Sequence, residues 1–129
     1  MRRVLAACVV AALSGHATAA EFSRADVCKA TIAIEMGRET ASMRTDQDGN
    51  TPVISYVRED DLQRFVYRCK FNGNRVIWAG YFDDEGSWGR WRDSPEFDDA
   101  VTKFEVQGAK LVVTNSQMGT HIFTKQQFK

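Results

Sequence analysis

A change in hydrophobic period near residue 52 most constrains the fold of this chain. Before it, Val27, Ala30, Thr31 and Ile34 recur at the spacing of one helical face. After it, apolar and polar residues alternate with the period of two that is typical of strands. The alternating segments are residues 52–58, 64–71, 75–82, 100–106, 110–115 and 120–128. The pattern predicts one helix followed by a sheet.

Residues on either side of the helical pattern indicate where the helix begins and ends. Ser23 and Asp26 have the spacing of a capping box, with Asp in place of the usual Glu or Gln. Gly37 follows the apolar stripe and is a plausible left-handed stop. We therefore expect a helix over about residues 24–36, with Cys28 at the margin of its apolar stripe.

Short turn-forming stretches separate the strand segments and favour an antiparallel arrangement. Examples are "NGN" at 72–74 and "QGA" at 107–109. Connections this short join neighbouring strands as hairpins, which produces a meander. The inner face of such a sheet is the only large partner for the helix. We predict an α+β fold, in which one N-terminal amphipathic helix packs on an antiparallel meander of six to seven strands, pinned by one disulfide.

The first twenty residues differ from the rest and predict a secretory signal peptide. Arg2 and Arg3 precede an apolar run at 4–13, and Ala17 and Ala19 are placed for an A-x-A cleavage site. The run is shorter than the roughly 20 apolar residues of a membrane anchor. "LAAC" at 5–8 resembles a lipidation box, but the apolar stretch before its cysteine is too short. The alternative to a signal peptide is that residues 1–20 form a buried N-terminal helix. After them, we expect a single domain over residues 21–129.

Loss of this leader would remove Cys8 and leave Cys28 and Cys69 as a pair. In an oxidising compartment such a pair predicts a structural disulfide. Closing this loop would contribute roughly 4 kcal/mol in the chain-entropy model. The alternative, a metal or redox pair, lacks a C-x-x-C motif. We therefore expect a periplasmic or secreted protein stabilised by one disulfide.

The charge balance disfavours two classes of partner. The chain has 17 basic and 17 acidic residues, and the leader contains two of the arginines and none of the acids. A nearly neutral domain lacks the concentrated basic surface by which proteins bind nucleic acids or anionic lipids. We therefore predict no nucleic-acid partner and no membrane span.

Motifs for catalysis or for a cofactor are absent from the sequence. His121 is the only histidine after the leader, and no G-x-S-x-G or glycine-rich phosphate loop accompanies it. The "DQDGN" turn does not fit a calcium loop, because counting from Asp46 places glycine at position 4 and valine at position 12. We predict no metal, no cofactor and no enzyme. Acidic residues at 83–85 and 96–99 leave a two-carboxylate hydrolase as an alternative.

The stretch "GSWGRWRDSP" at 86–95 holds the candidate binding residues. If it is a short strand, successive side chains point to opposite faces. Trp91 would then pack inward under the helix, whereas Trp88 would share the outer face with Arg90 and Arg92. Tryptophan and arginine dominate binding hot spots. We predict that Trp88, Arg90 and Arg92 form a binding surface.

Three stretches, "CKATIAIEMGRE", "YRCKFNGNRVIWA" and "GRWRDSPEFDDAVT", resemble a group of small exported proteins from Gram-negative bacteria. The group carries a CKA–MGR helix, a YRC strand leading into GNRVIW, and a GRWR element. The resemblance covers nearly all of the chain after the leader and implies export and a two-cysteine architecture, but no activity. This sequence departs from the pattern by the extra residues "GYFDDEGS". The C-type lysozyme inhibitors are similar only in architecture, since their signature is absent.

These observations favour a protein without catalytic machinery that binds a protein or a cell-wall glycan, as inhibitors and immunity proteins do. Two alternatives remain open at this stage. One is a structural or stress-related envelope component with no ligand. The other is a periplasmic hydrolase built on the acidic turns.

Overall fold

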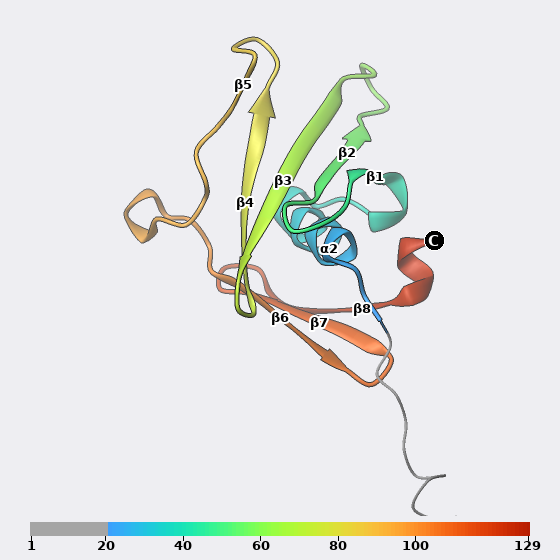
Figure 1. Ribbon diagram of the computed structural model, residues 1–129. Coiled ribbons are helices and arrows are strands. Elements are labelled where there is room, and N and C mark those ends of the chain that lie inside the picture. Colours follow the sequence, from blue (N-terminus) through green and yellow to red (C-terminus); the bar gives the residue numbers. More distant parts are fainter. Residues whose placement is uncertain (1–20) are drawn as a thin grey trace, which may run out of the picture.

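The computed structural model describes residues 21–129, so the predicted signal peptide lies outside the described residues (Figure 1). Helix α2 spans Arg24–Met36, as predicted. The Ser23 hydroxyl accepts a hydrogen bond from the Asp26 amide at 3.0 Å, and the Asp26 carboxylate accepts one from the Ser23 amide at 3.1 Å. Gly37 ends the helix in the left-handed region with φ 64°. The predicted capping box and stop residue are confirmed.

Eight antiparallel strands follow, and seven of them form a meander in the order β1-β2-β3-β4-β6-β7-β8, while β5 pairs with β4 off this path. Three short 3-10 helices, η1, η2 and η3, cover Thr40–Ser42, Pro95–Phe97 and Lys125–Phe128. The strands are β1 Arg44–Gln47, β2 Val53–Val57, β3 Arg64–Asn72, β4 Arg75–Phe82, β5 Ser87–Trp88, β6 Thr102–Gln107, β7 Lys110–Asn115 and β8 Gly119–Thr124. The antiparallel meander is confirmed.

Two elements and one boundary differ from the sequence prediction. Strand β1 was not predicted because its four residues are all polar and all exposed, so they show no alternation. Strand β5 has only two residues. The last predicted strand stops at Thr124, where the side chain of Gln127 caps the Thr124 amide at 2.9 Å and starts η3.

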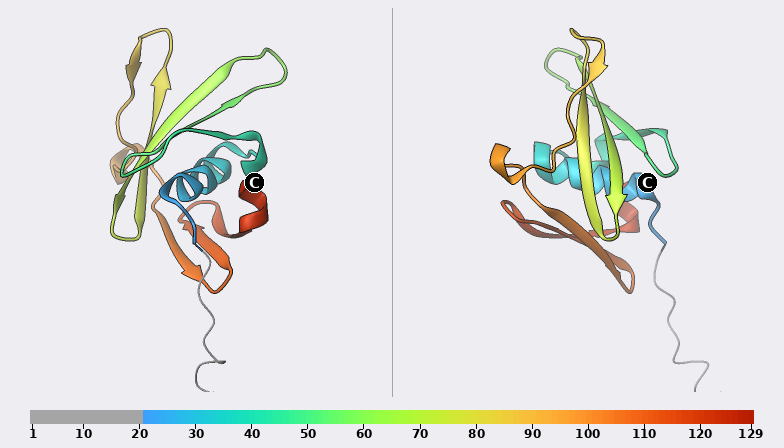
Figure 2. Two further views of the ribbon diagram at one scale, coloured as in Figure 1. Left: turned by 45° about the vertical axis from the view of Figure 1, so that its right-hand side comes forward. Right: turned by 60° about the vertical axis from the view of Figure 1, so that its left-hand side comes forward.

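The sheet curls into a half-barrel around the helix rather than offering it one flat face (Figure 2). Helix α2 contacts β2, β3, β4 and β7, and its residues 27–34 are all buried. On the open side, the Thr40 hydroxyl of η1 donates to the Gln127 carbonyl of η3 at 2.6 Å. The prediction of a one-sided amphipathic helix is therefore wrong, since the curl and these closing segments surround it. The helix is also not at the N-terminus of the chain, because residues 1–23 precede it.

The predicted disulfide joins the helix to the sheet. Cys28 and Cys69 are bonded with their Cα atoms 5.8 Å apart, and both residues are fully buried. Their bridge fixes α2 against β3 at the centre of the apolar core. None of the helices described in residues 21–129 has the length and apolar character needed to cross a membrane.

Candidate functional site

The segment after β5 places the tryptophans differently from the sequence prediction. Trp88 pairs with Tyr81, the Gly89 amide donates to the Gly80 carbonyl at 2.7 Å, and the Arg92 amide donates to the Trp78 carbonyl at 2.8 Å. Three residues on this segment thus span two on β4, which is the count of a β-bulge. The extra residue reverses the alternation, so Trp91 lies on the same outer face as Trp88. The predictions that Trp91 is a core residue and that the two rings lie on opposite faces are wrong.

The two indoles enclose an arginine on the outer face. The Arg68 guanidinium lies 4.4 Å from the ring centroid of Trp88 and 4.6 Å from that of Trp91. The Lys70 ammonium lies 4.5 Å from the Trp91 centroid. Ala79, which pairs with Arg68 across β3 and β4, is fully buried beneath this layer. Trp88 therefore lies in a cation–aromatic cluster, but with Arg68 rather than with Arg90 or Arg92.

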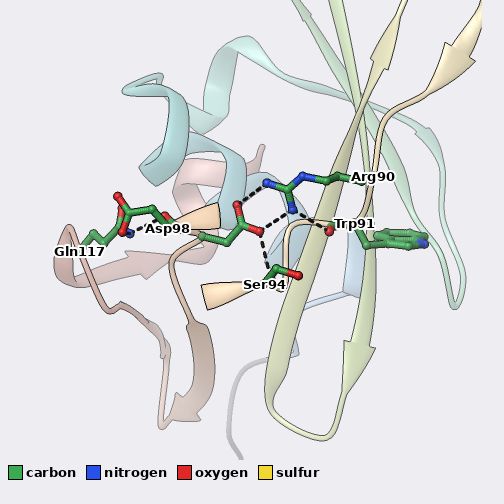
Figure 3. A network of polar contacts seen from close by, with 6 residues as sticks. Arg90, Trp91, Ser94, Asp98 and Gln117 are labelled. Atoms are coloured by element: carbon green, nitrogen blue, oxygen red, sulfur yellow. Dashed lines mark hydrogen bonds and ion pairs between the residues drawn. The ribbon is translucent and has the colours of Figure 1, made fainter. Parts of the chain in front are cut away.

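Arg90 takes part in a polar network instead (Figure 3). Its guanidinium makes two hydrogen bonds to the Asp99 carboxylate, at 2.6 and 3.0 Å, and the Ser94 amide donates to the same carboxylate at 3.0 Å. The Arg90 guanidinium holds the pKa of Asp99 below its usual value. Figure 3 shows the Trp91 ring pointing away from this network. Arg90 thus fixes the loop that follows the tryptophans and is not part of the surface around Trp88.

Arg92 lies on the inner face, where its guanidinium is 5.1 Å from the ring centroid of Trp78. The bulge also explains the inward position of Arg92, because the extra residue reverses the alternation and turns Arg92 inward and Trp91 outward. The three predicted binding residues are therefore separated: Trp88 lies outside, Arg90 at the loop, and Arg92 in a cleft.

That cleft forms where β3 and β4 separate. Their residue pairs run from Asn72–Arg75 to Tyr67–Gly80 and stop there, although β3 begins at Arg64 and β4 continues to Phe82. Beyond that point β3 pairs with β2 and β4 with β5, so two hairpins diverge past the end of the helix (Figure 1). The fork contains a cleft of about 530 Å³, lined among others by Met36, Phe65, Tyr67, Trp78, Phe82 and Arg92.

Contacts between aromatic rings hold the floor of the cleft in place. Tyr56 stacks on Phe65 and on Tyr67, with centroids 5.4 and 6.0 Å apart, and Tyr67 meets the edge of Trp78 at 5.7 Å. Burial raises the pKa of Tyr67, so its phenol keeps its proton at an alkaline pH where an exposed tyrosine would ionise. The Arg38 guanidinium lies 4.9 Å from the Tyr56 centroid. The floor is therefore a packed aromatic surface.

Sequence reasoning missed this cleft although a signal was present. Phe65 and Tyr67 alternate along β3, as Trp78, Gly80 and Phe82 do along β4. A glycine between large inward-facing residues often marks a place where something else approaches the strand. A β-carbon on Gly80 would lie 3.5 Å from the Tyr67 ring, an ordinary contact. The gap at Gly80 is therefore not required by packing within the chain.

The acidic turns do not assemble into one group of carboxylates. Asp83 and Asp84 lie at the lip of the cleft, whereas Glu85 is exposed in the turn and Glu96 belongs to η2. Within residues 21–129, no three histidine, cysteine or acidic side chains gather as metal ligands would.

Comparison with protein-family models, with curated proteins and with solved structures found no match to this chain. The resemblance to exported proteins suggested by its motifs stays a prediction.

Proposed function

We propose that this protein is an exported, non-catalytic binding protein, whose cleft accepts an extended peptide segment of a partner protein. The observation that carries the proposal is the fork itself. Two adjacent strands leave each other while both remain strands, so their facing backbone edges at 64–66 and 81–82 have no ladder between them in the described structure. Free strand edges pair readily with an added strand.

The lining of the fork supports a peptide rather than another ligand. An added strand would present alternate side chains to the aromatic floor, where Tyr67 and Trp78 provide preformed apolar contact area. Arg92 has no carboxylate partner in residues 21–129, and its Nε is buried without an acceptor. An acidic side chain or the terminal carboxylate of the peptide would pair with the accessible part of the Arg92 guanidinium. Recognition would thus combine backbone pairing, apolar anchors and one ion pair.

The predicted signal peptide and the disulfide support an extracytoplasmic location, because disulfides persist in oxidising compartments. An inhibitor or immunity-type protein would act in this way, by holding a segment of another protein.

Selection from a random peptide library on the purified, disulfide-intact protein tests the proposal. We expect enriched peptides with apolar residues at alternate positions and an acidic group. Gly80→Leu should abolish their binding by filling the cleft, Arg92→Gln should weaken it about tenfold, and Gly80→Ala is the matched control that leaves most of the cleft open. The proposal is wrong if no peptide is enriched, or if enriched peptides bind Gly80→Leu as well as they bind the original protein.

A further inference from the structure

The outer face of β3, β4 and β6 carries a second candidate site, remote from the cleft floor. Strand pairing places Arg68, Lys70, Arg75 and Lys103 on this face, and we call these four residues the cationic stripe. The face is opposite to that of Cys69, Trp78 and Val76, which belong to the core. From Arg68 to the level of Arg75, which pairs with Asn72, the stripe extends over about 13 Å, at roughly 3.3 Å per residue.

The four cations of the stripe form no ion pair in the described residues, and the acidic residue nearest to them along β6 on the same face is Glu105. Arg75 is directly opposite Lys103 across β4 and β6, and like charges in that position are destabilising. An anion would relieve the repulsion between Arg75 and Lys103.

Arg68 is already held in position for such an anion. Because the Arg68 guanidinium lies against both indoles, its conformation is restricted, and less side-chain entropy would be lost on binding. Guanidinium groups bind carboxylates through two parallel hydrogen bonds along the edge of the plane.

The acidic turns and the covered indoles around the stripe determine which class of polyanion can bind there. The acidic turn 83–85 lies at one end and the acidic residues 96–99 lie at one side (Figure 1), so a broad negative surface such as a membrane would meet repulsion. Binding of single-stranded nucleic acid uses free aromatic faces for base stacking. Here Arg68 and Lys70 already lie over the indoles. A narrow chain whose charges are carboxylates fits both conditions.

We propose that the cationic stripe binds an acidic polysaccharide of the uronic-acid class. This site is independent of the peptide cleft, since Arg92 and the aromatic floor lie on the opposite face of the sheet.

Fluorescence anisotropy with labelled oligogalacturonate tests the inference across a salt series. Four ion pairs predict a slope of about −3 for log K against log[salt]. Arg75→Gln/Lys103→Gln should halve that slope without disturbing the packed indoles. The control Arg92→Gln/Lys129→Gln, which removes the same two positive charges away from the stripe, should leave the slope unchanged. Adding Arg68→Gln to the double variant should weaken oligogalacturonate binding further.

Three other probes separate the remaining outcomes. Inorganic polyphosphate and single-stranded DNA of matched charge should bind more weakly than oligogalacturonate, and vesicles with anionic lipid should not bind. The inference is overturned if oligogalacturonate fails to bind at low salt, if the double variant keeps the full slope, or if any of these probes binds as tightly. If the original protein binds oligogalacturonate but no peptide, the proposed peptide-binding function is refuted and the proposal for the cationic stripe stands.

Discussion

Gly89 is the residue on which the position of the tryptophan segment most directly depends. A β-carbon built there overlaps the ring of Phe82 and lies 3.3 Å from the Gly80 carbonyl oxygen. The same Gly80 carbonyl accepts the Gly89 amide at 2.7 Å. Gly89→Ala must therefore displace the Phe82 ring or lengthen this hydrogen bond.

The expected cost follows from two opposing effects. Overpacking costs about 1–3 kcal/mol, with the lower end appropriate here because Phe82 is 41% exposed and its ring can turn toward solvent. Replacing glycine also removes freedom from the unfolded chain, which stabilises by about 0.4–1 kcal/mol where the backbone suits alanine. We expect Gly89→Ala to lower the free energy of unfolding by about 1 kcal/mol. Gly80→Ala, which makes only an ordinary contact with Tyr67, should leave stability unchanged or raise it slightly.

A double-mutant cycle with Phe82→Ala isolates the proposed contact. Urea unfolding followed by tryptophan fluorescence would provide the four free energies, provided the denaturant slope stays constant. In the Phe82→Ala background, Gly89→Ala should cost nothing or stabilise. If Gly89→Ala lowers the free energy of unfolding equally in both backgrounds, the Phe82 ring is not the cause. If Gly89→Ala raises stability in the original protein as much as Gly80→Ala does, the β-carbon at residue 89 makes no close contact with either the Phe82 ring or the Gly80 carbonyl oxygen.

Three further outcomes are expected. Cys28→Ala/Cys69→Ala should lower the free energy of unfolding by about 4 kcal/mol in urea, because the 41-residue separation closes a long loop; a change below 1 kcal/mol would contradict this. Asp99→Asn should lower the free energy of unfolding at neutral pH. Arg90 lowers the pKa of Asp99, so the stability that this carboxylate contributes is lost as pH falls through the lowered value, and the difference between the two proteins should shrink in acid. If unfolding measured as a function of pH shows a difference that persists in acid, the charge is not its cause. Leu62→Gly should raise stability by about 0.5 kcal/mol, because Leu62 has φ 60° and is 76% exposed, so relief of the left-handed strain exceeds the entropy cost of glycine; thermal unfolding at a lower temperature would refute it.

Local pattern was sufficient for the helix and six of the strands. The helix follows from its capping residues and stop glycine, and six strands follow from alternation between short turns. The disulfide was predictable because Cys28 and Cys69 are the only cysteines outside the predicted signal peptide. The all-polar strand β1 and the two-residue β5 could not be recognised in this way, since each depends on pairing with a neighbour that is already in place.

The candidate sites depended on tertiary structure. Alternation assigns a side chain to a face only while pairing is regular, and the bulge after Trp88 adds one residue to the count. That single residue sent Trp91 outward and Arg92 inward, so the predicted set of Trp88, Arg90 and Arg92 came apart. The cleft likewise exists because β3 and β4 part at Gly80. The sequence by itself determined the helix and the six regular strands, because propensity and periodicity are local. Only the three-dimensional structure decided which side chains meet, because hydrogen bonds between distant segments set the register.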